Sequence, residues 1–184
     1  MKANKNISAV HEGMIVTGMS QCIGHIASIS TDPFKKETHT FLEHLILSLR
    51  ELGYYVEKYF GKSLDKKSLA TMESVKNMRD TICHRSSPQN LLNPHLYLSG
   101  GFNFKNDDIE VQYGKTKVML SGGLVDLYLT FRRAITNSNH FAYIKKSPSW
   151  NIEELKLQGV TKKLAGSLNT KKVTEKMREG IRKT

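Results

Sequence analysis

The sequence lacks the features that mark secreted, disulfide-stabilised and membrane-spanning proteins. Among its 184 residues there are two cysteines, Cys22 and Cys83, which lie far apart and without the paired spacing of a disulfide framework. The stretch from Ile7 to Ile29 is interrupted by histidine, glutamate and glutamine, so no long uninterrupted apolar run is present. The stretch predicts neither a signal peptide nor a membrane span, and we expect a cytoplasmic protein with no membrane partner.

Acidic residues are also scarce relative to basic ones. The chain has 28 Lys and Arg against 17 Asp and Glu, a formal net charge of +11. Residues 145–184 alone hold eleven Lys and Arg against four Asp and Glu. A positive excess favours polyanions, because contact with phosphates releases their counterions. The charge balance therefore favours a nucleic-acid partner, although positive charge can also serve only to keep a protein soluble.

The spacing of apolar residues predicts a mainly α fold. Steps of three and four residues indicate helices over 6–29, from Pro33 to Gly61, over 65–85 and over 124–135. The apolar positions of the first helix that lie at near-helical spacing are Ile7, Val10, Met14, Met19, Cys22, Ile23 and Ile26. Asp32 and Asp65 can cap the second and third helices. Glycines weaken the first helix, since each costs about 1 kcal/mol relative to alanine in a helix interior.

A small antiparallel β insertion is expected at about 96–120. Segments 97–104, 109–113 and 116–120 look like strands, with turns at 106–108 and at Gly114-Lys115. The fold is thus predicted as a four- to five-helix up-and-down bundle with this insertion, over residues 1–144. Residues 145–184 are predicted to form a basic C-terminal appendage that is partly helical, with Val173, Met177 and Ile181 at helical spacing.

The expected helix over 65–85 places an arginine among apolar residues. On a helical wheel Arg79 falls within the stripe formed by Leu69, Met72, Val75 and Ile82. A charge on a packing face needs an anion, a carboxylate or a water-filled interface, because burying it unpaired is expensive. The alternative is a guanidinium that extends past the edge of the core into solvent.

A carboxylate and an imidazole flank this arginine. Asp80 lies four residues before His84, so the two are neighbours on the helix surface. A carboxylate beside an imidazole favours its charged form and fixes the ring orientation, which makes His84 a candidate proton carrier. The alternative is an ordinary surface pair.

The segment Arg79-Asp80-Thr81-Ile82-Cys83-His84 resembles the signature of the HEPN family. That signature is Arg-x4–6-His near the end of a helix in a four- or five-helix bundle, with a polar residue after the arginine. Arg85-Ser86-Ser87-Pro88 also resembles the family's exit from that helix. The letters match at about 75–90 only, and the strand insertion departs from a minimal bundle.

The resemblance implies a metal-independent endoribonuclease of a defence or toxin–antitoxin type system, without a cofactor. It implies that His84 and Arg79 act on an RNA phosphodiester in a site composed by a homodimer, with Asp80 orienting His84. Basic residues that would contact RNA are Lys76, Arg85, Lys171 and Lys172. A neutralising antitoxin or other partner protein is a further possibility. The alternative is a non-catalytic HEPN-like module that binds nucleic acid or protein.

Two other motifs are set aside. Cys22-x2-His25 with Cys83-His84 does not predict a zinc site, because adjacent helical residues point about 100° apart and no second closely spaced pair exists. Gly114-Lys115-Thr116 ends like a phosphate-binding P-loop, but Ile109 stands where the first glycine is required. We expect no metal site and an ordinary hairpin turn.

Overall fold

The computed structural model describes residues 7–31, 33, 35–61, 64–84, 100–105 and 108–146. The fold class is confirmed, because helices form the body and a three-stranded antiparallel sheet is inserted between them. The elements in chain order are α1 (Ala9–Thr31), α2 (Thr38–Phe60), α3 (Lys66–Cys83), β1 (Gly100–Lys105), β2 (Asp108–Tyr113), β3 (Thr116–Met119), the π-helix η2 (Leu120–Val125), α6 (Asp126–Thr136) and the 3-10 helix η3 (Asn139–Lys146).

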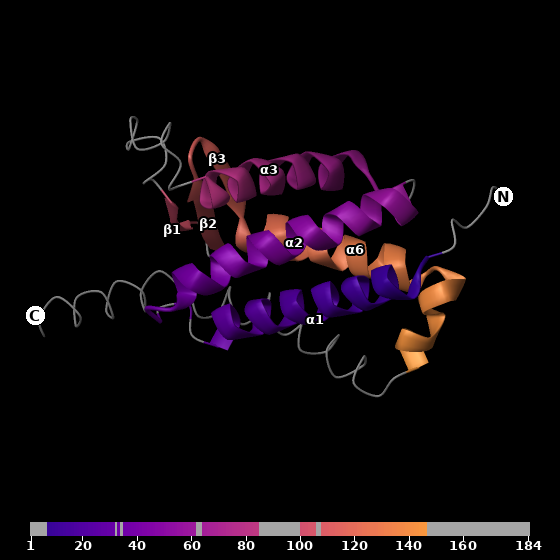
Figure 1. Cartoon of the computed structure of the whole chain (residues 1–184). Coiled ribbons are helices and arrows are strands. Elements are labelled where there is room, and N and C mark those ends of the chain that lie inside the picture. The colour runs from indigo at the N-terminus through magenta and orange to yellow at the C-terminus, as the bar shows by residue number, and fades with distance from the viewer. Residues whose placement is uncertain are drawn as a thin grey trace, which may run out of the picture.

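Helix α2 lies at the centre of the body. Figure 1 shows α1 on one side of α2 and α3 on the other, with α6 behind them. The sheet packs at the end of the bundle where α3 finishes, and η3 lies at the opposite end, beside the start of α1. Leucines 45, 49 and 52 of α2 are at most 1% exposed, and they share one apolar core with Tyr128 and Phe131 of α6.

The predicted start of α2 is wrong. We expected the helix to begin at Pro33, but it begins at Thr38, with Glu37 as its N-cap. The amide of Thr38 donates to the carbonyl of Lys35, so a turn precedes the helix. Pro33 is instead buried in the connection between α1 and α2. Gly61 ends α2 as predicted.

The buried face of α1 agrees only in part with the apolar positions that the sequence places at helical spacing. Of the apolar positions at helical spacing, Met19, Cys22 and Ile26 are buried, but Val10 and Met14 are 72% and 37% exposed. The buried stripe instead follows a three- and four-residue alternation that begins at Ile15 and continues through Met19, Cys22, Ile26 and Ile29. Gly18 lies within this stripe, where a Cβ would come 3.4 Å from the Cβ of Leu52. Close approach to α2 therefore fixes the rotation of α1.

The sheet forms the predicted meander and is tied to α6 by one carboxylate. Gly114 adopts a positive φ of 59° in the hairpin between β2 and β3. Asp108, at the start of β2, accepts hydrogen bonds from the amide and hydroxyl of Ser121 at 3.0 and 2.9 Å. It also accepts from the amides of Ile109 and Gly122. Asp108 thus fixes η2, and with it the start of α6, against the sheet.

The first two residues of the predicted appendage belong to a helix that packs on the body of the protein. Lys145 and Lys146 belong to η3, whose Phe141 is fully buried in the body. Residues 147–184, which include Lys171, Lys172 and the predicted amphipathic helix, lie outside the described residues.

We predict that Asp108→Ala lowers the free energy of unfolding by about 1–3 kcal/mol, because several donors lose a partly buried acceptor. Denaturant unfolding followed by circular dichroism measures this change. Asp126→Ala is the matched control, since the ion pair of Asp126 with Lys67 is exposed and is worth less than about 1 kcal/mol. Equal losses in both variants would contradict the role of Asp108.

Candidate functional site at the end of α3

The end of α3 is positioned by a cap at one end and by core contacts at the other. The carboxylate of Asp65 accepts a hydrogen bond of 2.7 Å from the amide of Ser68, which confirms the predicted N-cap. This bond lowers the pKa of Asp65. Near the other end, Val75 and Met78 are at most 1% exposed. These anchors determine which residues of the last turns face solvent.

Arg79 forms an ion pair with its neighbour in the chain. Its Nη1 donates to Oδ1 of Asp80 at 2.9 Å. The side chains are 43% and 47% exposed, so the pair lies at the surface. The hydrogen bond to Asp80 is the main cause of a raised pKa for Arg79, and the nearby Cys83 contributes. The guanidinium is therefore charged, anchored and accessible.

The predicted packing face of α3 needs correction. Leu69, expected in the buried stripe, is 45% exposed, whereas Ser68, Val75 and Met78 are buried. The contacts of α3 with α2, α6 and the sheet centre the buried face on these residues. Since each residue turns the helix by about 100°, Arg79 falls at the edge of this face rather than within it. The alternative of a guanidinium reaching solvent is the one observed.

His84 terminates α3 as its C-cap. Its backbone amide donates to the carbonyl of Asp80 at 3.0 Å, and the residue is exposed. The carboxylate of Asp80 forms an ion pair with Arg79. That Asp80 orients His84 stays a prediction. The structure thus brings Arg79, Asp80 and His84 together within two turns of one helix end.

The predicted RNA contacts are only partly within the described residues. Lys76 is exposed one turn before Arg79 and pairs with Glu73 at 3.5 Å. Arg85, Lys171 and Lys172 lie outside the described residues.

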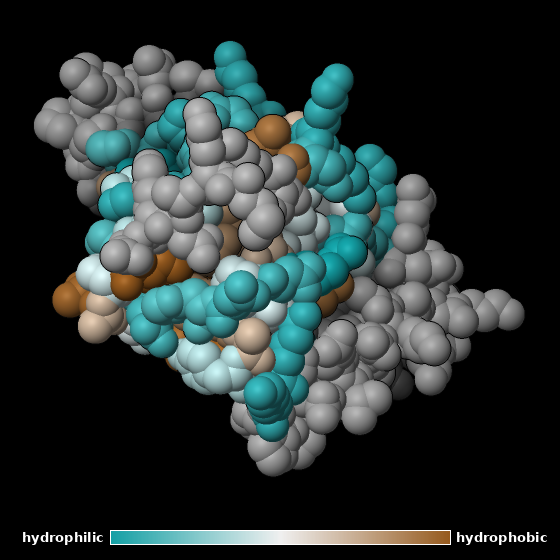
Figure 2. Space-filling view, turned by 90° about the vertical axis from the view of Figure 1, so that its right-hand side faces the viewer, coloured by the Kyte–Doolittle hydropathy of each residue, from teal (hydrophilic) through white to brown (hydrophobic). Residues whose placement is uncertain are grey.

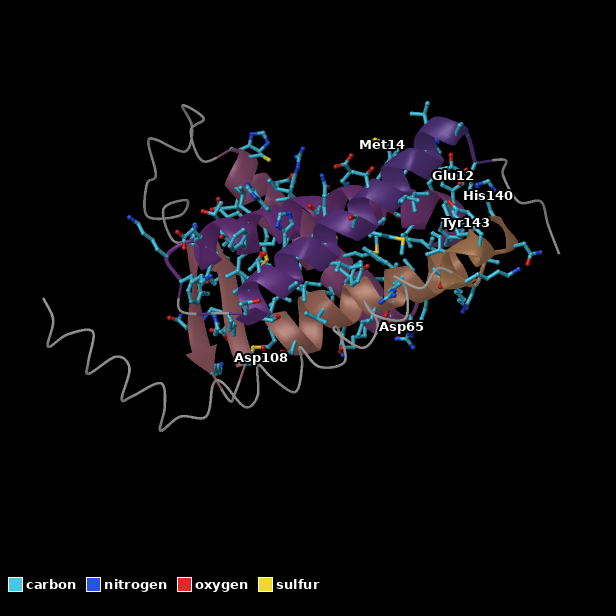
Figure 3. All side chains as sticks on the ribbon, turned by 90° about the horizontal axis from the view of Figure 1, so that it is seen from below. Glu12, Met14, Asp65, Asp108, His140 and Tyr143 are labelled. Atoms are coloured by element: carbon cyan, nitrogen blue, oxygen red, sulfur yellow. The ribbon has the colours of Figure 1, made fainter. Side chains whose placement is uncertain are left out.

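A second polar cluster, not predicted from the sequence, lies at the opposite end of the bundle. Glu12 of α1 accepts hydrogen bonds from the hydroxyl of Tyr143 at 2.8 Å and from Nε2 of His140 at 3.0 Å (Figure 3). These bonds lower the pKa of Glu12. Beside them, Nδ1 of His11 is 2.5 Å from the hydroxyl of Tyr59. Contacts between residues more than 120 positions apart leave no periodic signal in a sequence. The cluster fastens η3 to α1.

A small polar cavity of about 180 Å³ lies between the first turn of α3 and α6. The ion pair of Lys67 with Asp126 stands at its wall. It is lined by Asp65, Lys67, Ser68, Thr71, Gly123, Asp126, Leu127, Thr130 and Arg133. Arg79 follows Asp65 by 14 residues, so Asp65 at the cavity and Arg79 lie about 21 Å apart along the helix axis.

Within the described ranges, no group of three or more His, Cys, Asp or Glu side chains is placed to hold a metal ion. No helix among those ranges is long and apolar enough to cross a bilayer.

Comparisons with protein-family models, with curated proteins and with solved structures gave no match for the chain.

We predict that a thiol reagent modifies one cysteine of the native protein and two after denaturation. Cys83 is exposed beside Arg79, whereas Cys22 is fully buried and its pKa is raised by burial. Mass spectrometry after brief labelling counts the adducts. Cys83→Ser should abolish native labelling, and rapid native labelling of that variant would contradict the packing of α1.

We predict that Glu12→Gln lowers the Tm at neutral pH and has little effect well below the ordinary glutamate pKa of about 4.3. The folded pKa of Glu12 is depressed by Tyr143 and His140. Its stabilising contribution is therefore present above the unfolded pKa and is lost as the pH falls through the folded one. Thermal unfolding of both proteins across this pH range measures the difference, and a constant difference would contradict the contacts.

Proposed function

We propose that the chain is a metal-independent endoribonuclease, of a defence or toxin–antitoxin type, that uses Arg79 and His84. The observation that supports this best is the joint exposure of a charged arginine and a histidine at the end of α3. The resemblance of residues 79–84 to the HEPN signature supplies the chemistry that such a pair would perform.

In the proposed reaction, His84 takes the proton of a ribose 2′-hydroxyl. The 2′-oxygen then attacks the adjacent phosphorus, and the bond from phosphorus to the 5′-oxygen of the next nucleotide breaks. The leaving oxygen takes up a proton, so the products are a cyclic 2′,3′-phosphate end and a free 5′-hydroxyl end. Arg79 holds the phosphate and stabilises the negative charge that develops on its oxygens. No metal ion is needed for these steps.

The helix geometry argues for two copies of the site. His84 follows Arg79 by five residues, which separates them by about 140° around the helix and about 7.5 Å along it. A single copy therefore converges poorly on one phosphate. A two-fold partner facing the end of α3 would place the arginine of one chain near the histidine of the other. The proposed active unit is a homodimer through the ends of α3.

The second candidate function is RNA binding without cleavage. An exposed guanidinium pairs with phosphate whether or not a side chain that can act as general base lies within reach. Residues 145–184 supply further positive charge. Arg79 would then act as an anchor for nucleic acid or for an acidic partner such as an antitoxin. A steep salt dependence of binding without any product separates this function from the first.

We predict that purified protein cleaves RNA in the presence of EDTA and that His84→Ala lowers the rate by about 10²–10⁴-fold, the usual contribution of general acid–base catalysis. Gel analysis of a labelled RNA and detection of the cyclic phosphate end measure it. His140→Ala is the matched control, because it removes an exposed histidine at the other end of the bundle. An unchanged rate in folded His84→Ala would overturn the assignment of His84.

We predict that mixing Arg79→Ala and His84→Ala chains restores activity that neither has alone. If each site takes its arginine and its histidine from different chains, half of the dimers are mixed and carry one intact site, so about a quarter of the activity returns. The rate after equilibration of the mixture measures it. No recovery, with both variants folded and dimeric, would contradict the composite site.

A further inference from the structure

Helix α1 presents an outer face without charge along its whole length. Glu12 is the one Lys, Arg, Asp or Glu among its 23 residues, and its carboxylate is bonded to His140 and Tyr143. The exposed positions that form this α1 outer face are Val10, Gly13, Met14, Val16, Thr17, Ser20, Gln21 and Gly24. The exposed faces of α2 and α3 carry several acidic and basic residues each.

Contacts within the described residues do not explain the composition of this face. A solvated helix face is ordinarily rich in charged side chains. Here Val10, Met14 and Val16 are 72%, 37% and 39% exposed. A Cβ added at Gly13 or at Gly24 would meet nothing within 4 Å, although glycine is unfavourable inside a helix. Gly18 differs, because it faces Leu52 of α2.

The apolar surface continues onto the neighbouring helix η3. Tyr143 is 53% exposed and is bonded to Glu12, which lies one turn before Val16. Figure 3 places Met14 near Glu12, His140 and Tyr143 at this end of α1. Hydrophobic side chains are visible at the surface of the same end of the molecule in Figure 2, among hydrophilic ones.

We propose that the α1 outer face pairs two copies of this chain, α1 against α1. A two-fold interface brings the same surface of two chains together, so a face without charged side chains meets its copy without electrostatic repulsion. This matters for a chain of net charge +11. The exposed apolar side chains lose water on pairing, and the two glycines allow the helix backbones to approach closely.

The same features argue against other occupants of the α1 outer face. RNA requires basic residues, and α1 contains no Lys or Arg. Helices that lie on membranes carry Lys and Arg on their polar side, which α1 also lacks. The helix is about 34 Å long, and a standard interface buries about 800 Å² on each partner. To bury an area of this size, the pairing needs the whole length of α1 together with the adjacent surface formed by Tyr143.

The test introduces charge into the face. Thr17→Lys and Ser20→Lys, made together in the full chain, should weaken self-association at least tenfold in sedimentation equilibrium. Thr40→Lys and Ala70→Lys are the matched control, since both replaced residues are exposed and uncharged on α2 and α3. The far-ultraviolet circular dichroism spectrum and the Tm should be unchanged in both proteins. Gly13→Ala with Gly24→Ala should also weaken association while leaving the Tm unchanged or raised.

Several outcomes would overturn the proposal. They are a wild-type chain that stays monomeric at its highest soluble concentration, an association that the α1 lysines leave unchanged, and binding to vesicles of phosphatidylcholine and phosphatidylserine without self-association. A nitroxide on Cys83 separates this pairing from one through the ends of α3. The labels stay far apart in an α1 pair, because α1 and α3 lie on opposite sides of α2 (Figure 1). The outcome does not depend on RNA cleavage.

Discussion

The burial of α2 between α1 and α3 is the constraint on which the rest of the structure depends. Its leucines supply apolar surface to both neighbours and to α6, and burial of such surface is the dominant favourable term in folding. With α2 at the centre, α1 and α3 occupy opposite sides of the body (Figure 1). The two surfaces that stand out chemically, the end of α3 and the outer face of α1, are therefore separated by the core itself.

The chemistry at the end of α3 follows from this packing. Val75 and Met78 enter the core and fix the rotation of the helix, so Arg79 emerges at the edge of the buried face. Its pairing with Asp80 keeps the guanidinium in place at small cost to an incoming ligand, because an exposed ion pair is worth at most about 1 kcal/mol. Under the proposed function, a phosphate would replace Asp80 as the partner of Arg79.

Local signals predicted turns and several helix ends correctly, but they misplaced the start of α2, and the apolar spacing predicted the rotation of helices poorly. The cap at Asp65, the turn at Gly114 and the end of α2 at Gly61 follow from one or two residues, and each is confirmed. The outward position of Val10 depends instead on how closely α1 approaches α2, and a sequence does not state that distance. For the candidate site, the sequence identified the helix end, but the exposure of Arg79 and its pairing with Asp80 required the packing of α3. The cluster around Glu12 joins residues 128 positions apart and had no local signal.

The two proposed contacts between copies differ in what they require. An α1 pair brings uncharged surfaces together, so it needs nothing besides a second chain. Two ends of α3 that face each other bring the guanidinium of Arg79 toward its copy, and like charges oppose that approach. A phosphate between them removes the repulsion and supplies a shared partner. Under the two proposals, RNA would help to assemble the site that cleaves it, and the α1 pair would keep a second chain close by. Two distinct two-fold contacts in one chain close into a tetramer when their axes are perpendicular. Under the proposed function, quaternary structure is thus part of the catalytic machinery rather than a background property of the fold.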